Sequence, residues 1–254
     1  HIDTVKPASG WTHNPFEAED DGEKIYGLGS NDAGASVVSL IAAFRMLAVE
    51  PRQYNLLFLA SCEEEVSGKN GIESVLPLLP EIAVAIVGEP TQMHPAVAEK
   101  GLMVLDCEVK GKAGHAARNE GVNAIYEAIP VIETLRNLTF PVESAFLGPV
   151  KISVTQIAAG TQHNVVPDAC RFVVDVRTTD AYTNEETLSL ISEAVPQAHL
   201  VARSTRLRPS SISDSHPLVG RLKMSGRKPF GSPTLSDQAL MPFQSVKIGP
   251  GASA

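Results

Sequence analysis

The sequence predicts an α/β protein in which a mostly parallel sheet with flanking helices carries an inserted ferredoxin-like domain. Residues 1–97 alternate short apolar runs with helix-like segments, which is typical of a parallel sheet covered by helices. Residues 98–211 instead follow the order strand, helix, strand, strand, helix, strand, which is the ferredoxin-like arrangement. From residue 212 onward the mixed pattern of the first part returns. We therefore expect residues 1–97 and 212–254 to form one domain, into which residues 98–211 are inserted.

One long helix and two buried strands are expected in the first domain. Residues 36–49 are mostly apolar and contain neither Gly nor Pro, which favours a mostly buried helix. Residues 54–61 and 84–87 are short apolar runs, and we interpret both as buried strands. Ligands of open α/β sheets gather beyond the carboxyl ends of the strands, so the residues that follow each strand are the first candidates for a site.

The inserted domain is expected to contain four half-buried strands and two helices. Apolar and polar residues alternate, as they do in strands with one buried face, over residues 103–110, 150–157, 170–177 and 199–206. Helical patterns cover residues 123–138 and 184–194, with Asn184 as the predicted N-cap of the second helix. Two helices on one face leave the other face or an edge of the sheet open, so this domain is suited to pairing.

The charge balance and the cysteines exclude some functions. The chain carries 29 acidic and 21 basic residues, which argues against a nucleic-acid or anionic-membrane surface because such surfaces are basic. No apolar run approaches the ~18 residues of a membrane span. Cys62, Cys107 and Cys170 are few and odd in number, which favours reduced thiols in a cytoplasmic protein.

Histidine and carboxylate side chains cluster at the predicted strand ends and before the long helix. These residues are His1, Asp3, Asp32, Glu63, Glu64, Glu65 and Glu89. Carboxylates brought together raise one another's pKa unless a cation compensates their charge. A divalent metal supplies that charge, and mixed histidine and carboxylate ligands suit zinc, with cobalt or manganese as substitutes.

Each of these features also has an ordinary explanation. A histidine followed two residues later by an aspartate occurs by chance, a run of glutamates is commonly a solvated loop, and Glu89 is compatible with a plain loop. Asp32 is compatible with an N-cap of the following helix. Gly27 and Gly29 resemble part of a dinucleotide-binding fingerprint, but the Asp32 carboxylate would repel a pyrophosphate. Only the joint pattern favours a metal site.

Seven stretches, in order along essentially the whole chain, resemble one known family. They are HIDTV at 1–5, GLGSNDAGASV at 27–37, SCEEEVSG at 61–68, VGEPT at 87–91, GKAGHAA at 111–117, GTQHNVVPDACRFVVDVR at 160–177 and SPTLSDQAL at 232–240. The family is that of the co-catalytic zinc amidohydrolases and metallopeptidases. It contains acetylornithine deacetylase, succinyl-diaminopimelate desuccinylase, aminoacylases and glutamate carboxypeptidases, and VGEPTQMHPAVAEKG most resembles the first. The resemblance implies two divalent metal ions, zinc first, and a homodimer formed through the inserted domain.

The resemblance also implies a role for each candidate residue. The implied metal ligands are His1 and Glu89 for one ion, Asp32 as a bridge, and Glu65 for the other ion. The implied general base and acid is Glu64, and Asp3 orients His1. His115 is implied to reach the active site of a partner subunit and stabilise the oxyanion, although a histidine in a surface loop is the ordinary alternative. Asn164 and Arg177 match positions that bind substrate.

The expected reaction is hydrolysis of the amide bond of an N-acyl amino acid. N2-acetyl-ornithine is the first expected substrate, with N-acetyl-citrulline and N-succinyl-ornithine as close relatives. Succinyl-diaminopimelate desuccinylase, a dipeptidase or carboxypeptidase, and a non-catalytic relative remain as alternatives. A copper enzyme that binds through the amine and ring of His1 is disfavoured, because such proteins are usually disulfide-bonded. The family also has a segment before the HxD motif and a histidine after Gly-Pro-Gly, so both ends are expected to be truncated and the second metal site to lack a ligand.

Overall fold

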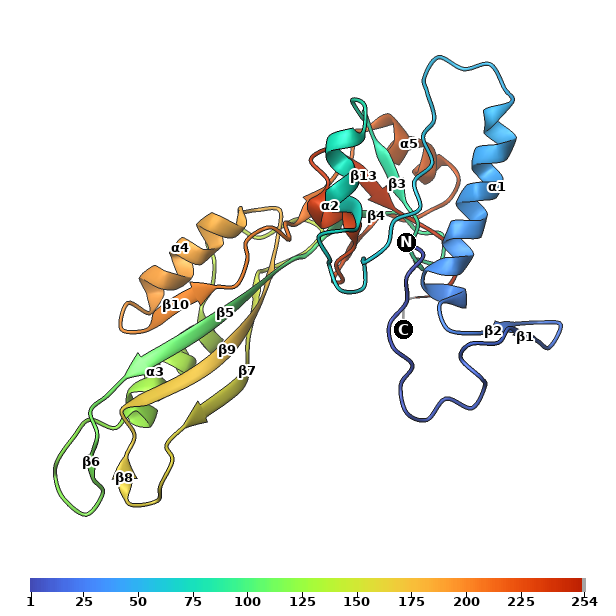
Figure 1. Cartoon of the computed structure of the whole chain (residues 1–254). Helices are drawn as coiled ribbons and strands as arrows, with labels where there is room; N and C mark the ends of the chain where they lie inside the picture. Colours follow the sequence, from blue (N-terminus) through green and yellow to red (C-terminus); the bar gives the residue numbers. More distant parts are fainter. Residues whose placement is uncertain (253–254) are drawn as a thin grey trace. The chain divides into compact units, whose positions relative to one another are not determined.

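The computed structural model describes residues 1–252 and divides into two compact units (Figure 1). The first unit contains residues 1–98, 211–231 and the chain from residue 236 onward, whereas the second contains residues 99–210 and 232–235. Each unit has a hydrophobic core of its own. The α/β fold class is confirmed, while the catalytic and pairing roles of the two predicted domains stay predictions.

The second unit has the predicted ferredoxin-like order of strands and helices. Its strands are β5 (Gly101–Lys110), β7 (Lys151–Ala159), β9 (Ala169–Thr178) and β10 (His199–Ala202). They form an antiparallel sheet in the order β10-β5-β9-β7. Helices α3 (Ala124–Asn137) and α4 (Asn184–Ala194) pack on the sheet through the same core. The last strand is shorter than the predicted 199–206.

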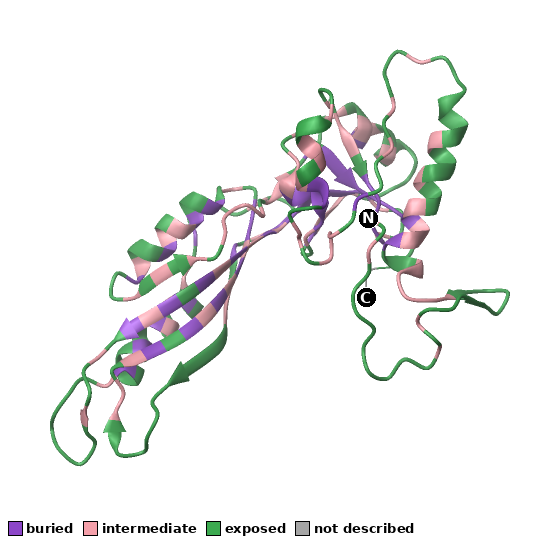
Figure 2. Cartoon of the chain, viewed as in Figure 1, coloured by how far each residue is buried: buried purple, intermediate pink, exposed green. Residues whose placement is uncertain are grey.

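Alternation along the two central strands builds the core of this unit. Every second residue of β5 from Met103 to Val109 is buried, and the same holds for β9 from Cys170 to Val176. Figure 2 shows this alternation as bands of purple along β5 and β9. Because successive side chains of a strand point to opposite faces, the buried set meets the helices and the other set faces away from them.

The two helices of the second unit begin with side-chain caps. The Asn123 side chain accepts a hydrogen bond from the N–H of Ile125 at the start of α3. The prediction that Asn184 is the N-cap of α4 is wrong. Thr183 is the N-cap, and it forms a capping box with Glu186. Asn184 is instead fully buried.

Short strands form the sheet of the first unit. The strands are β3 (Ala85–Val87), β4 (Ala96–Glu99), β11 (Ser210–Ser211), β12 (Phe230–Ser232) and β13 (Ser245–Lys247). Strand β13 runs parallel to β3 and antiparallel to β4, in the order β11-β4-β13-β3 with β12 beside β4. The small core contains Val97, Ile212, Val219 and Val246. The strand predicted at 84–87 is therefore present.

Helices and one hairpin complete the first unit. They are the hairpin of β1 (Glu19–Asp20) and β2 (Ile25–Tyr26), the π-helical turn Ser30–Ala35, α1 (Ser36–Ala48), α2 (Ile72–Val75), the 3₁₀ helices Leu76–Leu78 and Asp237–Leu240, and α5 (Pro217–Met224). Within residues 1–252, no helix has both the length and the apolar character needed to cross a membrane.

Two predictions about the first unit are wrong. The helix predicted at 36–49 forms as α1, but it is not mostly buried, since Ser36 is its only buried residue and Val38 is 68% exposed. Residues 54–61 form no strand and are largely exposed. An apolar run becomes a buried strand only when neighbouring strands pair with it, and among the described residues none pairs with this run.

Candidate metal centre

The N-terminal segment lies against the loop that carries the three consecutive glutamates. The backbone N–H of Ile2 donates to the carbonyl of Ser61 at 2.8 Å. The Asp3 carboxylate accepts the backbone N–H of Glu64 at 3.3 Å and that of Glu65 at 3.2 Å. Asp3 thus fixes this loop through two backbone hydrogen bonds, an arrangement that the sequence did not predict.

The imidazole of His1 is the centre of a carboxylate cluster. Its side chain is 1% exposed, and Nδ1 lies 3.0 Å from the backbone carbonyl oxygen of Asp3 and 3.4 Å from its carboxylate. On the other side of the ring, Nε2 lies 3.1 Å from Asp32 Oδ1, 3.7 Å from Glu64 Oε2 and 3.6 Å from Glu89 Oε1. The turn that carries Asp32, the glutamate loop and the residues that follow β3 therefore converge on the ring of His1.

Asp32 reaches this ring from an irregular turn and does not cap α1. Gly29 adopts a left-handed conformation with φ of 76°, and Asp32 itself has a non-helical φ of −113° and ψ of 100°. The N-cap of α1 is Ala35, without a side-chain cap. The alternative of Asp32 as a helix cap is therefore wrong, and its carboxylate is available at the site.

The three glutamates point to different partners. Glu63 is directed to Asn70, whose backbone N–H and side-chain amide both donate to its carboxylate, at 3.0 and 3.1 Å. Two groups of side chains have ligand atoms within 4.8 Å of one another: His1, Asp32 and Glu65 in one group, and His1, Glu64 and Glu89 in the other. Glu64 thus lies about as close to His1 as the predicted ligand Glu89 does.

The cluster perturbs the protonation of its own members. Burial alone lowers the pKa of His1, but the hydrogen bond with Asp32 and the charges of Glu64 and Glu89 outweigh it and raise that pKa to about 10. Burial, together with the charge of Glu89, raises the pKa of Glu64 to about 8. Burial also raises the pKa of Glu65. For both glutamates burial is the largest cause, and the neighbouring carboxylates add to it.

The donor set fits a divalent metal. One imidazole and four carboxylates supply nitrogen and oxygen ligands, which zinc accepts. The two groups share His1 and offer different carboxylates around its ring. The Asp3 contact on the far nitrogen of His1 is the outer partner that metal-ligating histidines usually have.

Sequence reasoning gave no role to Asp237, a buried carboxylate beside this cluster. It accepts a hydrogen bond from the Ser61 hydroxyl, and its charge acts on Glu64. The stretch SPTLSDQAL contains Asp237 within the family resemblance, and an acidic residue between Leu235 and Ala239 was the signal that could have singled it out.

The second unit holds the other three predicted site residues. His115 lies in β6 (Gly114–His115), which pairs with β8 (Val165–Val166), and the N–H of Ala116 donates to the carbonyl of Asn164 at 3.0 Å. His115 and Asn164 are thus near neighbours. Arg177 lies near the C-terminal end of β9, roughly 26 Å along the strand from its first residue, Ala169, at ~3.3 Å per residue.

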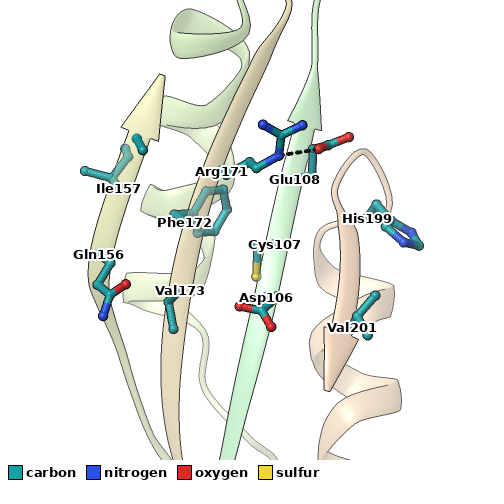
Figure 3. Close-up of a pocket in the computed structure, with 11 residues that line it drawn as sticks. Asp106, Cys107, Glu108, Gln156, Ile157, Arg171, Phe172, Val173, His199 and Val201 are labelled. Atoms are coloured by element: carbon teal, nitrogen blue, oxygen red, sulfur yellow. Dashed lines mark hydrogen bonds and ion pairs between the residues drawn. The ribbon is translucent and has the colours of Figure 1, made fainter. Parts of the chain in front are cut away.

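Arg177 is bound within its own strand, where its guanidinium forms two hydrogen bonds with Asp175, at 2.9 and 3.2 Å. A hollow on the sheet lies elsewhere and contains no predicted site residue. Figure 3 shows Arg171 reaching toward Glu108 there, with Nε 2.7 Å from Oε2, while Val173 and Val201 line the same hollow. The structure therefore gives no shared site for Arg177 and His115.

Comparison with known proteins matches both units. Residues 97–202 match the peptidase dimerisation domain M20_dimer. An acetylornithine deacetylase of Myxococcus xanthus is 33% identical over 184 residues, which cover 70% of this chain and 48% of the relative. A succinyl-diaminopimelate desuccinylase of Novosphingobium aromaticivorans is 26% identical over 204 residues, 76% of this chain and 54% of the relative. The chain spans about half the length of the curated relatives it matches.

Solved structures share the fold. The aminopeptidase PepT of Bacillus cereus has a TM-score of 0.72 at 17% identity, covering 92% of this chain and 67% of that one. The YXEP protein of Bacillus subtilis, described as a dinuclear metal-binding peptidase from the M20 family, has a TM-score of 0.62 at 18% identity, covering 92% and 68%. Residues 97–202 therefore match the M20 peptidase dimerisation domain, and the chain as a whole is related to acetylornithine deacetylases and succinyl-diaminopimelate desuccinylases.

Proposed function

We propose that this protein is a metal-dependent amidohydrolase that cleaves the amide bond of an N-acyl amino acid, with N2-acetyl-ornithine as the first substrate. One observation carries the proposal: carboxylates from separate loops converge on the buried imidazole of His1. The relatives named acetylornithine deacetylase, at up to 33% identity, support the substrate class.

The proposed ligands are taken from the two groups of side chains, and Glu64, a member of the second group, is kept as the base. His1 and Glu89 would hold one ion, Glu65 would hold the other, and Asp32 would be shared between them; zinc is the expected metal, with cobalt or manganese as substitutes. When bound, such ions lower the pKa of a water and polarise the amide carbonyl. Asp3 keeps His1 and the Glu64–Glu65 backbone in place from the other side of the ring.

Glu64 is the proposed general base and acid. It is largely shielded from solvent, with a side chain 11% exposed, and its carboxylate lies 3.7 Å from the His1 ring. In this position it can take a proton from the attacking water and deliver it to the nitrogen of the leaving amine.

The dimerisation domain supports a homodimer. We propose that His115 of one protomer serves the active site of its partner by stabilising the oxyanion, and that Asn164 and Arg177 bind substrate. For Arg177 this requires release of the hydrogen bonds with Asp175. The three free cysteines fit the proposed cytoplasmic location, because thiols stay reduced there.

A substrate panel tests the proposal. The full-length protein is loaded with zinc, cobalt or manganese and offered N2-acetyl-ornithine, N-succinyl-diaminopimelate and unrelated dipeptides. We expect N2-acetyl-ornithine to be turned over fastest, and equal turnover of unrelated dipeptides would contradict the deacetylase. Preference for the succinylated substrate would favour the second candidate, desuccinylation, which the desuccinylase relative at 26% identity supports. A full-length protein that binds no metal would favour a non-catalytic relative.

A further inference from the structure

Asp237 is a buried carboxylate that the proposed mechanism leaves unused. It is 8% exposed and begins the 3₁₀ helix Asp237–Leu240, where the Ser236 hydroxyl oxygen accepts the N–H of Gln238. Its Oδ2 accepts a hydrogen bond from the Ser61 hydroxyl at 2.5 Å. Asp237 is absent from both groups of potential metal ligands found within residues 1–252. Asp237 therefore acts on the site through its charge and through the residues that it contacts, without being one of the candidate ligands.

Ser61 connects Asp237 to the site. It stands three positions before Glu64, the proposed base, and is itself buried. Its backbone carbonyl accepts the N–H of Ile2 at 2.8 Å, next to His1. Because its hydroxyl also donates to Asp237, Ser61 ties the N-terminal segment and the glutamate loop to a helix that lies far away in the sequence.

Packing alone does not explain why a serine and an aspartate are buried together at Ser61 and Asp237. Burial raises the pKa of Asp237, whereas the hydrogen bond from Ser61 and the charge of His1 lower it. Two apolar side chains of the same shape would fill the space without the desolvation of a carboxylate. A hydrogen bond is directional, however, and therefore holds the loop in one position, as apolar contacts do not.

We propose that Asp237 is a positioning residue of the metal centre, and that it fixes the Glu64–Glu65 loop and the His1 segment through the Ser61 hydroxyl without binding metal itself. The inference rests on the proposed metal-dependent function. Hydrogen-bond partners of ligand residues typically change metal affinity about 10–100-fold when they are removed.

The test compares three variants in the full-length protein. Ser61→Ala removes the donor, whereas Ser61→Thr keeps a hydroxyl. The matched control is Ser245→Ala, which removes another buried hydrogen bond of the same unit, from Gln238 Nε2 to Ser245 Oγ at 2.8 Å. Zinc affinity is measured by competition with a chelator, and kcat and KM are measured on N2-acetyl-ornithine.

We expect Ser61→Ala to weaken zinc affinity about 10–100-fold and to lower kcat while KM stays unchanged. Ser61→Thr and Ser245→Ala should keep the wild-type zinc affinity. The inference is overturned if Ser61→Ala binds zinc as the wild type does, or if Ser245→Ala weakens binding equally. A wild-type protein that binds no zinc would instead remove the proposed function, and this inference with it.

A further variant covers the case in which Ser61→Ala does not fold. Asp237→Asn keeps an oxygen that can accept the Ser61 hydrogen bond but removes the charge. A positioning role predicts that Asp237→Asn retains zinc affinity within about tenfold, below the loss typical of a broken outer contact. A loss of stoichiometric zinc in Asp237→Asn would show that Asp237 is itself a ligand, and would overturn the inference.

Discussion

The two units of this protein differ in how their backbones are built. In the second unit, β5 and β9 pair over ten residues each and alternate buried and outward-facing side chains. In the first unit, the sheet strands have two to four residues, and the candidate metal ligands lie on the turns and loops around them. Within residues 1–252, every non-glycine residue with a positive φ also lies in the first unit. Regular pairing builds a scaffold, whereas irregular backbone lets chemical groups converge.

The largest expected effect of a single substitution concerns the chemistry of the first unit. Glu64→Ala should lower kcat by about 10²–10⁴-fold, because proton transfer by a positioned carboxylate contributes about that much. Metal content should stay near the wild-type value, since Glu64 is the proposed base and not a ligand. Steady-state kinetics and metal analysis of the same preparation check both points. Glu63→Ala is the matched control, because Glu63 is directed to Asn70 and its loss should leave kcat within a few-fold.

The scaffold of the second unit should be sensitive to loss of volume. Leu105→Ala should lower the free energy of unfolding by about 2–5 kcal/mol, because Leu105 is 0% exposed in the core and the truncation leaves a cavity. Val38→Ala on α1 of the first unit should change it by less than about 0.5 kcal/mol, because Val38 is 68% exposed. Denaturant unfolding measures both. A similar loss for both variants would contradict the described difference in burial.

Metal binding should depend on pH. The pKa of His1 is raised to about 10 in the metal-free protein, so this imidazole carries a proton at pH 7, and a metal must displace that proton to bind. Zinc affinity should therefore rise as the pH rises from 6 to 8, by about tenfold per pH unit for each proton released. Isothermal titration in buffers of different ionisation enthalpy counts the protons. Affinity independent of pH would show that His1 is not a ligand.

The smallest effect should come from a helix end in the second unit. Thr183→Ala should lower the free energy of unfolding by about 1 kcal/mol, because it removes the capping box at the start of α4. Thermal unfolding of the two proteins provides the measurement. An unchanged stability in Thr183→Ala would contradict the role of Thr183 as the cap of α4.

The sequence predicted the second unit better than the first for a physical reason. Alternation at period two identifies a half-buried strand by itself, so β5 and β9 were found to within two residues. A continuous apolar run such as residues 54–61 indicates a strand only if partner strands cover it, and such partners are not visible in the run itself. The cap of α4 was misplaced by one residue because Thr183 and Asn184 are both good capping residues.

The candidate site was partly predictable. Strand ends and motif spacing pointed to His1, Asp32 and Glu89, which the structure brings together. Glu63 and Glu64 differ in position because the Glu63 carboxylate turns toward Asn70, and the identity of three consecutive glutamates does not encode which of them does so. The Ser61–Asp237 hydrogen bond joins positions far apart in the chain, so no local pattern reveals it.

The central claim is that the cluster around His1 is a metal centre. A crystal structure of the full-length protein grown with zinc, with anomalous scattering recorded at the zinc edge, tests it most directly. We expect a zinc peak within about 2.0–2.2 Å of His1 Nε2 and of carboxylate oxygens from Asp32 and Glu89. A fully ordered cluster without a peak, while zinc is bound elsewhere in the same crystal, would contradict the claim.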